Sequence, residues 1–333
     1  MKNFTYFRPT TAEQAVTLLE ARFGNTEMLA GGTDLLALQK EYIAQPGRVV
    51  SLNAIAGLKT IVVGERSVTI GAGVTLASIA GHAELKRLFP ALTMAAAEIG
   101  GPQIRNMGTL GGNLCQRNRC WYFRDEHSPC LLKGGQTCYA IEGENKYHAI
   151  FTANHRCVIA SPSTLATGLI ALGATAEVLG PKNRRSVEMA KFFHAPTGPT
   201  EREHTVAANE LVTSVTIPVS GLNSAAYEVR QRQVSEWPLV QCAVSFQGGR
   251  NGAKATNVKI VLSQVAPTPI VAEAAGRAVD NRAINDAVAT AAGRAAVDGA
   301  KPLSQGAYKV RLVEVAVKRA LMIAAGLPHY WEA

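Results

Sequence analysis

Cysteine thiols are the first residues in this chain that could do chemistry. Five of the six cysteines lie between residues 115 and 157, at irregular spacing and with no C-x-x-C pair: Cys115, Cys120, Cys130, Cys138 and Cys157. Structural zinc sites usually bring their ligands as close pairs, so zinc is the weaker alternative. An iron–sulfur cluster needs four thiolates that meet in space but not in sequence. The density of thiols therefore favours a cluster, whereas Cys242, in an apolar strand-like run, is expected to be a small buried hydrophobe.

Two glycine-rich loops could hold an anionic nucleotide. The first, LAGGTDLL, runs from Leu29 to Leu36 and places two adjacent glycines between a short strand and a helix. Without Cβ atoms the backbone there can turn its N–H groups toward a phosphate, and the helix start adds partial positive charge. The second, GTLGGN, spans 108–113 and adds the polar side chains of Thr109 and Asn113. Neither is a G-x-G-x-x-G fingerprint, but together they suit one long ligand with a diphosphate and a flat ring, such as FAD.

The elements that must position these loops read as a small α/β unit followed by mixed strands and helices. Thr11 is a plausible cap for the first helix, and the apolar periodicity changes to strand–turn–strand from residue 60. The expected helices cover 11–22, 33–43, 84–100 and the first part of 162–180; the expected strands cover 27–32, 48–55, the segments beside the turn at 64–65, the end of 162–180 and 210–219.

The C-terminal part has a different pattern. Strands are expected at 225–233, 240–247 and 257–266, followed by helices at about 281–297 and 306–326. Strands first and helices afterwards predict an α+β domain with helices on one sheet face. We therefore expect an FAD-binding domain at 1–220, made of subdomains 1–58 and 59–220 with a thiol-rich insert at about 117–157, and a C-terminal α+β domain at 221–333.

Composition limits the class of protein. The chain has 333 residues, of which 47% are hydrophobic and 18% charged, enough for two or three domains. The net charge of +9 is scattered apart from RNRCWYFR and PKNRR. Nucleic-acid binding is therefore not expected, and the surplus suits an anionic cofactor or an acidic partner. With no apolar stretch of secretory or membrane-spanning type, the expected location is cytoplasmic, or periplasmic only if a partner subunit carries the export signal.

Taken in order, the motifs AGGTDLL, TLGGNLCQRNRC and GLIALGA resemble the FAD-binding medium subunits of the molybdenum hydroxylases. That family contains xanthine dehydrogenase, carbon monoxide dehydrogenase and bacterial aldehyde oxidoreductases. The resemblance covers nearly the whole chain and implies an α+β fold: a two-part FAD-binding domain of the vanillyl-alcohol-oxidase/CO-dehydrogenase flavoprotein type, then a smaller α+β domain with an antiparallel sheet and helices. The thiol segment resembles a subset that adds a [4Fe-4S] cluster, as in periplasmic aldehyde oxidoreductase and 4-hydroxybenzoyl-CoA reductase.

The resemblance also implies site residues. The cluster ligands would be Cys120, Cys130, Cys138 and Cys157, with Cys115 in the flavin loop instead. The FAD contacts would be Leu29, Ala30, Gly31, Gly32, Thr33, Asp34, Leu35, Thr109, Gly112, Asn113, Ser163 and Thr164, with a basic contact at Arg230 or, alternatively, Arg232. Many relatives have aspartate at the position of Thr164, so a carboxylate contact is missing here or supplied elsewhere. His148 and His155 flank the thiols and could tune a cluster by hydrogen bonding, but without ligand spacing the expected role is packing or surface.

The implied function is electron transfer by one subunit of a heterotrimer. A large subunit would carry molybdopterin, a small subunit would carry two [2Fe-2S] clusters, and this chain would pass electrons through FAD to an external acceptor. Three alternatives stay open: inward electron flow as in the CoA reductase, a flavin-free zinc or iron–sulfur assembly module, and a stand-alone flavin oxidoreductase. The last is disfavoured because no acid, base and nucleophile constellation accompanies the motifs.

Overall fold

The N-terminal unit is a three-stranded parallel sheet in the order β1-β3-β2, formed by β1 (Thr5–Phe7), β2 (Thr26–Leu29) and β3 (Arg48–Ser51). This computed structural model describes residues 1–232 and 235–331. Parallel strands need crossover connections, which here contain α1 (Ala12–Thr17) and α2 (Leu35–Lys40). Thr11 caps α1 as expected, since its hydroxyl accepts the Gln14 N–H. Both helices are shorter than predicted, and α2 ends where Tyr42 adopts a left-handed φ of 58°.

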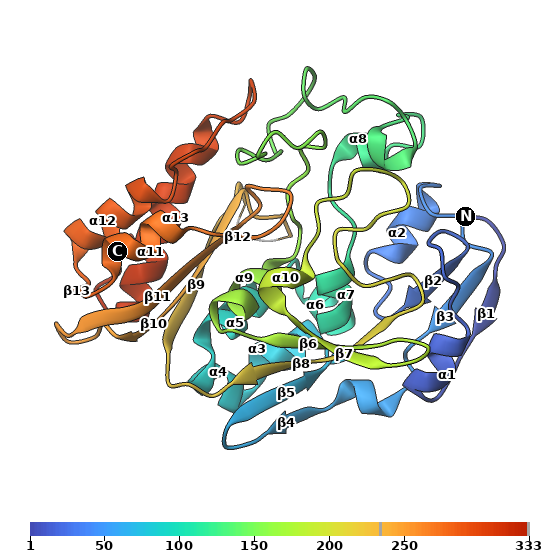
Figure 1. Cartoon of the computed structure of the whole chain (residues 1–333), viewed down its shortest axis with the longest axis horizontal. Helices are drawn as coiled ribbons and strands as arrows, with labels where there is room; N and C mark the ends of the chain where they lie inside the picture. The colour runs from blue at the N-terminus through green and yellow to red at the C-terminus, as the bar shows by residue number, and fades with distance from the viewer. Residues whose placement is uncertain (233–234, 332–333) are drawn as a thin grey trace.

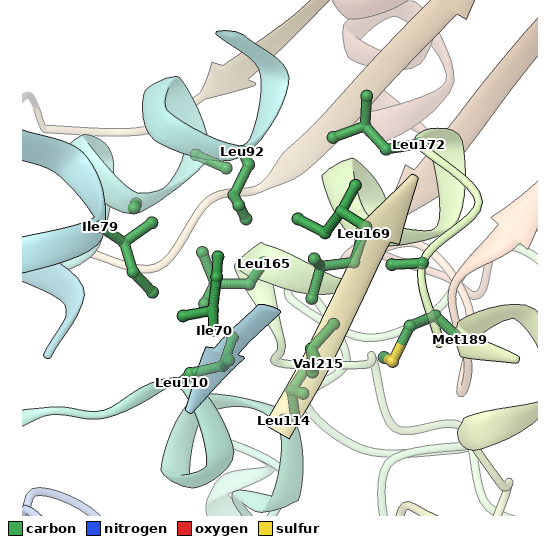
Figure 2. Close-up of a cluster of buried hydrophobic side chains, with 14 of the residues drawn as sticks. Ile70, Ile79, Leu92, Leu110, Leu114, Leu165, Leu169, Leu172, Met189 and Val215 are labelled. Carbon is green, nitrogen blue, oxygen red and sulfur yellow. The ribbon is translucent and has the colours of Figure 1, made fainter. Parts of the chain in front are cut away.

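A second, antiparallel sheet forms the centre of the molecule (Figure 1). Its order is β4 (Ile61–Val63), β5 (Ser67–Gly71), β8 (Leu211–Pro218), β6 (Thr175–Leu179) and β7 (Arg184–Glu188). Helix α9 (Thr164–Ala171) is buried along its whole length, which explains why its sequence is apolar all round. Figure 2 shows Leu165 and Leu169 of α9 close to Ile70 and Val215 of the sheet, within the largest hydrophobic core.

Short helices complete this region. They are η1 (Ala56–Lys59), α3 (Leu76–Gly81), α4 (Ala83–Leu88), α5 (Pro90–Glu98), α6 (Pro102–Met107), α7 (Leu110–Cys115), α8 (Trp121–Arg124), η2 (Leu131–Lys133) and α10 (Met189–Phe192). The helical run predicted at 84–100 is split because Pro90 starts α5 without a backbone N–H to continue α4. In the described part of the chain, no helix is long and apolar enough to cross a membrane.

The third sheet lies in the C-terminal domain and is antiparallel. It contains β9 (Asn223–Val229), β10 (Val240–Gly248), β11 (Lys254–Ser263), β12 (Ile270–Val271) and β13 (Arg282–Ala283). Helices α11 (Glu273–Val279) and α13 (Tyr308–Ala325) pack on one face, with α12 (Asp286–Ala295) against both helices, and α5 and α9 contact the other face (Figure 1). The expected α+β class is confirmed. The strand predicted at 225–233 ends earlier, at Val229, and residues 233–234 lie outside the described part.

The C-terminal sheet is buried on both faces, as the side chains of β10 show. Val244 belongs to the core that contains residues of α12 and α13, whereas its neighbour Ala243, on the opposite face, belongs to the central core. The hydroxyl of Ser245 donates to the carbonyl of Ala171, at the end of α9, over 2.6 Å. Because successive strand residues face opposite sides, one strand can join both cores.

The thiol-rich insert at 117–157 contains little regular structure and is held by the C-terminal domain. Asn145 and Gln305 exchange two hydrogen bonds, from Asn145 N–H to Oε1 (3.1 Å) and from Gln305 N–H to Oδ1 (2.9 Å). The Tyr308 hydroxyl donates to the carbonyl of Lys146, and the Ile150 N–H donates to that of Val265. The insert therefore has a defined path beside α13 (Figure 1).

Candidate functional site

The first glycine loop is a set of free backbone donors. Among the described residues, no acceptor receives the backbone N–H groups of residues 31–35. Gly32 has a φ of +75°, and a Cβ on Gly31 would lie 1.8 Å from the carbonyl oxygen of Met107. Both positions therefore require glycine, and the loop packs directly against the chain that leads into the second loop. Consecutive unsatisfied N–H groups in such a turn form a cradle for an anion.

The second glycine loop works differently from the first. It is the first turn of α7, in which the Thr109 hydroxyl accepts the Gly112 N–H (3.1 Å) and the Gly111 N–H donates to Ala72 (2.8 Å). The side-chain oxygen of Asn113 accepts from the Ser163 hydroxyl (2.8 Å). The backbone donors of this turn are therefore satisfied within the protein, and its glycines contribute space rather than N–H groups.

Two cavities of about 180 and 310 Å³ meet at these loops. Residues that border both are Thr33, Asp34, Thr109, Gly112 and Gln116. The first cavity runs over the N-terminal unit and the second runs toward α6 and the C-terminal domain, where it is bordered by Ile104 and Trp237. One ligand with two bulky ends and a narrow anionic middle fits this shape.

Most of the predicted flavin residues line these cavities. Ala30, Gly31, Gly32, Thr33, Asp34 and Leu35 line the first, Asn113 and Thr164 line the second, and Thr109 and Gly112 line both. Three other predicted residues, Leu29, Ser163 and Arg230, do not line either cavity. Ser163 acts on the site through Asn113, and Arg230 pairs with two wall residues, Glu98 and Glu228. The alternative Arg232 is exposed and pairs with Glu236.

Sequence reasoning missed the cations of the first cavity, namely Lys59, Arg117 and Arg202. Arg117 comes four residues after the end of the second loop, in the run QRNRC, so its neighbourhood was a usable signal. Arg202 comes from a distant loop without any motif and pairs with Glu27 at 3.3 Å. Burial lowers the pKa of Arg202 to about 10, which leaves it charged at neutral pH. These cations suit a ligand that carries phosphates.

A buried carboxyl group borders the second cavity. Glu228 accepts a hydrogen bond from Gln241 Nε2 at 2.9 Å, and the same nitrogen donates to the carbonyl of Thr164. Burial raises the pKa of Glu228 to about 7, and the negative charge of nearby Glu98 acts in the same direction, although the ion pair with Arg230 opposes both. Glu228 thus places a carboxyl group beside Thr164, in the region where the sequence suggested that one was missing.

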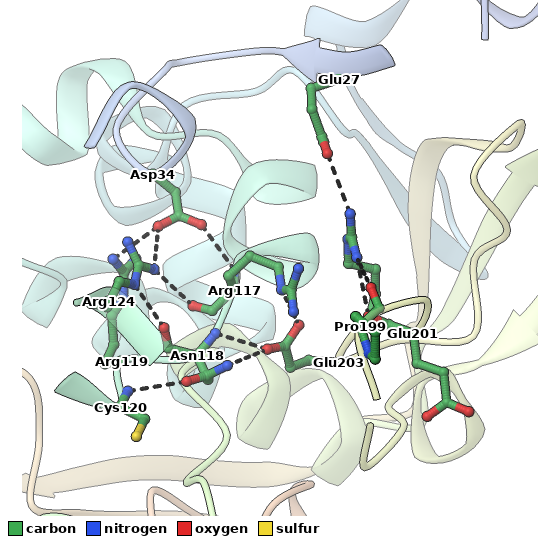
Figure 3. A network of polar contacts seen from close by, with 11 residues as sticks. Glu27, Asp34, Arg117, Asn118, Arg119, Cys120, Arg124, Pro199, Glu201 and Glu203 are labelled. Atoms are coloured by element: carbon green, nitrogen blue, oxygen red, sulfur yellow. Dashed lines mark hydrogen bonds and ion pairs between the residues drawn. The ribbon is translucent and has the colours of Figure 1, made fainter. Parts of the chain in front are cut away.

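Asp34 connects the first loop to the thiol segment (Figure 3). Its carboxylate accepts the Arg117 N–H (2.9 Å) and pairs with Arg119 (2.9 Å) and Arg124 (2.7 Å). Burial alone would raise the pKa of Asp34, but these partners hold it below its ordinary value. Nearby, the buried Glu203 carboxylate accepts both the backbone and the amide N–H of Asn118.

The network ends at the first thiol of the cluster segment. The side-chain oxygen of Asn118 accepts the Cys120 N–H at 3.1 Å, and His148 Nε2 lies 3.2 Å from Cys120 Sγ. His148 is buried, and burial and the charge of Lys309 lower its pKa to about 4. His148 is thus a buried packing residue, and its contact with the Cys120 thiol keeps open the alternative that it tunes a cluster by hydrogen bonding.

Four thiols meet in one small apolar cavity. Cys120, Cys130, Cys138 and Cys157 line it together with aromatic and aliphatic side chains, including Phe123. Cys115 lies apart from these four thiols, in the wall of the first of the two cavities described above. Burial raises the pKa of Cys120 to about 11, whereas a hydrogen bond from Cys157 lowers that of Cys138 to about 6. In the described chain, no three His, Cys, Asp or Glu side chains converge tightly enough for a single metal ion.

Comparison with known proteins identifies the class. Residues 2–220 match the family of the FAD binding domain in molybdopterin dehydrogenase, and residues 225–324 match the CO dehydrogenase flavoprotein C-terminal domain. The chain is similar to the aldehyde oxidoreductase FAD-binding subunit PaoB of Escherichia coli K12, with 33% identity over 83% of this chain and 85% of the relative.

A second relative gives the same result over more of the chain. The carbon monoxide dehydrogenase medium chain of Hydrogenophaga pseudoflava is 26% identical over 96% of both chains. A solved structure of that organism's enzyme, lacking the Mo-pyranopterin moiety of its cofactor, superposes with a TM-score of 0.75 and 26% identity over 97% of each chain. The chain belongs to the FAD-binding medium subunits of the molybdenum hydroxylases, which are oxidoreductase subunits. The expected fold, an FAD-binding domain followed by a C-terminal domain with an antiparallel sheet, is confirmed.

The glycine requirement of the first loop can be tested by Gly31→Ala. A methyl group 1.8 Å from the Met107 carbonyl must displace the loop, and overpacking of this kind costs about 1–3 kcal/mol. We expect FAD to bind roughly tenfold more weakly or worse, measured by flavin absorbance after purification and by titration of the apoprotein. Gly81→Ala is the matched control, because its Cβ would meet nothing within 4 Å. Equal flavin affinity in both variants would show that the loop does not hold the ligand.

The raised pKa of Glu228 predicts a pH-dependent stability. Between the ordinary value of 4.5 and about 7 the folded chain binds more protons than the unfolded chain, so stability falls as pH rises through this window. We expect Glu228→Gln to remove about 1–3 kcal/mol of this loss between pH 5 and pH 8, measured by urea unfolding of the flavin-free protein. Glu65→Gln, in an exposed turn, is the control. Parallel pH profiles for wild type and Glu228→Gln would contradict the assignment.

Proposed function

We propose that this chain is the FAD- and [4Fe-4S]-containing electron-transfer subunit of a heterotrimeric molybdopterin-dependent hydroxylase or dehydrogenase. The observation that carries the proposal is the pair of sites joined by Asp34, one built for a nucleotide and one lined by four thiols. A bound flavin exchanges electrons singly with iron–sulfur centres and in pairs with small acceptors. Family membership supports the flavin, and the four converging thiols support the cluster.

The protein's own residues would bind and orient the flavin. The free N–H groups of residues 31–35 and the cations Arg117 and Arg202 would hold the diphosphate. The second cavity would take the ring system between α6 and Trp237, with Thr164 and Glu228 in its wall. Glu228 could then hold or release a proton at its carboxyl oxygen near neutral pH, as charge in the cavity changes.

In this proposal the thiol cavity holds a cube-shaped cluster rather than a single ion, and the support for it is that four thiols line one cavity. Each of four thiolates would bind a different iron, so the sulfur atoms must stand farther apart than the ligands of one ion. Apolar side chains surround the thiols and would exclude water from the cluster. Cys120, Cys130, Cys138 and Cys157 are the proposed ligands, and His148 would contact Cys120 from outside the ligand set.

The partner subunits complete the proposal. The named relatives are subunits or medium chains, so we expect a large subunit with molybdopterin and a small subunit with two [2Fe-2S] clusters. Substrate choice would belong to the large subunit; an aldehyde, an N-heterocycle or another aromatic compound is the expected class. The expected location is cytoplasmic, with periplasmic export if a partner carries the signal. Electrons would leave through FAD to an external acceptor.

Counting iron per FAD in Cys120→Ser tests the cluster. We expect the variant to lose about four irons per chain because all four thiolates are required, with FAD largely retained, measured by iron analysis and flavin absorbance of the purified complex. Cys242→Ser is the control, since Cys242 lies in the core of the C-terminal domain, away from both the thiol cavity and the flavin cavities, and its iron per FAD should equal that of wild type. Unchanged iron in Cys120→Ser would refute the ligand set, and a wild-type protein without a flavin spectrum would favour the flavin-free alternative.

A further inference from the structure

A third cavity, of about 320 Å³, lies between the thiol site and the flavin cavity. Cys120 and His148 border it on one side, and on the other side it shares Arg119 and Trp237 with the second cavity, which is proposed above to hold the flavin ring. Its volume falls at the lower end of the range for sites that bind small organic ligands. Neither the flavin nor the cluster proposed above makes use of this space.

Lys309 places a buried amine without a carboxylate partner in the wall of this cavity. Its side chain is 1% exposed, and its ammonium donates to the carbonyls of Tyr147 (3.0 Å) and Gln264 (2.8 Å). An ammonium has three donors, so one remains. In the described residues no carboxylate lies within ion-pair distance of Lys309. Buried charges are normally paired, so a partner that is not part of the chain is expected.

Two further polar groups point to an anionic or carbonyl-bearing ligand. The side-chain nitrogen of Gln264 is buried, borders the cavity and has no acceptor among the described residues. The guanidinium of Arg119 stacks on Trp237, 4.3 Å from the ring centroid. The one carboxylate in the wall, Glu236, is already paired with Arg232. The cavity therefore offers more donors than acceptors.

Aromatic rings give the other half of the recognition. Trp121, Tyr147 and Trp237 border the cavity, and each keeps 39% of its surface exposed. Trp121 and Tyr147 meet edge to face, with centroids 5.5 Å apart. Exposed aromatic side chains gathered at one cavity offer flat apolar surface to a ring.

We infer that this cavity binds a planar aromatic carboxylate, with the carboxylate on Lys309 and Gln264 and the ring against Trp121 and Tyr147. Without such a ligand, burial lowers the pKa of Lys309 to about 7, and a bound carboxylate would restore its full charge. The inference does not depend on the proposed function, since the cavity and its donors belong to this chain alone.

Calorimetric titration of the full-length protein with 2-naphthoate and with 2-naphthamide tests the inference without any variant. The two probes share the ring and differ in the charge of the head group. We expect naphthoate to bind about tenfold more tightly, the change that a hydrogen bond between charged groups makes to a dissociation constant. Equal affinities, or no binding of either probe, would overturn the inference.

Lys309→Met then locates the site. The substitution keeps the length of the side chain and removes its charge, so we expect the preference for naphthoate to disappear while naphthamide binds as before. Lys301→Met, at an exposed lysine, makes the same change in net charge and should leave the preference intact. If Lys309→Met keeps the preference, the carboxylate binds elsewhere and the inference fails. Failure of the iron and flavin tests above would leave this result unaffected.

Discussion

The structure depends on one partly buried carboxylate, that of Asp34. It belongs to the glycine loop, yet its three partners, the Arg119 and Arg124 guanidinium groups and the Arg117 N–H, all come from the start of the thiol segment. Without this carboxylate the Arg119 and Arg124 guanidinium groups would face each other with no shared partner. The loop that would hold a diphosphate and the segment that would hold a cluster are therefore built as one unit.

This arrangement explains how an irregular insert can have a defined shape. Its beginning is tied to the flavin domain through Asp34 and Glu203, and its end is tied to the C-terminal domain through Asn145 and Gln305. Between these anchors the chain needs little regular structure, because the thiols and the apolar residues around them form a small core of their own. The same anchors leave a gap beside Lys309, into which donors and aromatic rings project.

The sequence predicted the elements that obey simple periodicity and the residues that sit in motifs. The strands around Ile70 and Val244, the Thr11 cap and the glycine loop were foreseen because each is a local pattern. Helix α11 was missed because its seven residues make only about two turns, too few to show a helical period in the pattern of apolar residues. Arg202 was missed because it pairs with Glu27, far away in the sequence, and Glu228 was missed because its role follows from burial, which the local sequence does not show. The free donors of the first loop and the satisfied donors of the second also look alike in sequence.

Flavin and iron content of Asp34→Asn tests the central claim most directly. The substitution keeps the shape of the side chain and removes the charge that holds Arg119 and Arg124. If one carboxylate supports both sites, the purified variant should contain less FAD and less iron than wild type, although Asp34 itself ligates no iron. Wild-type content of both FAD and iron in a folded Asp34→Asn protein would contradict the account.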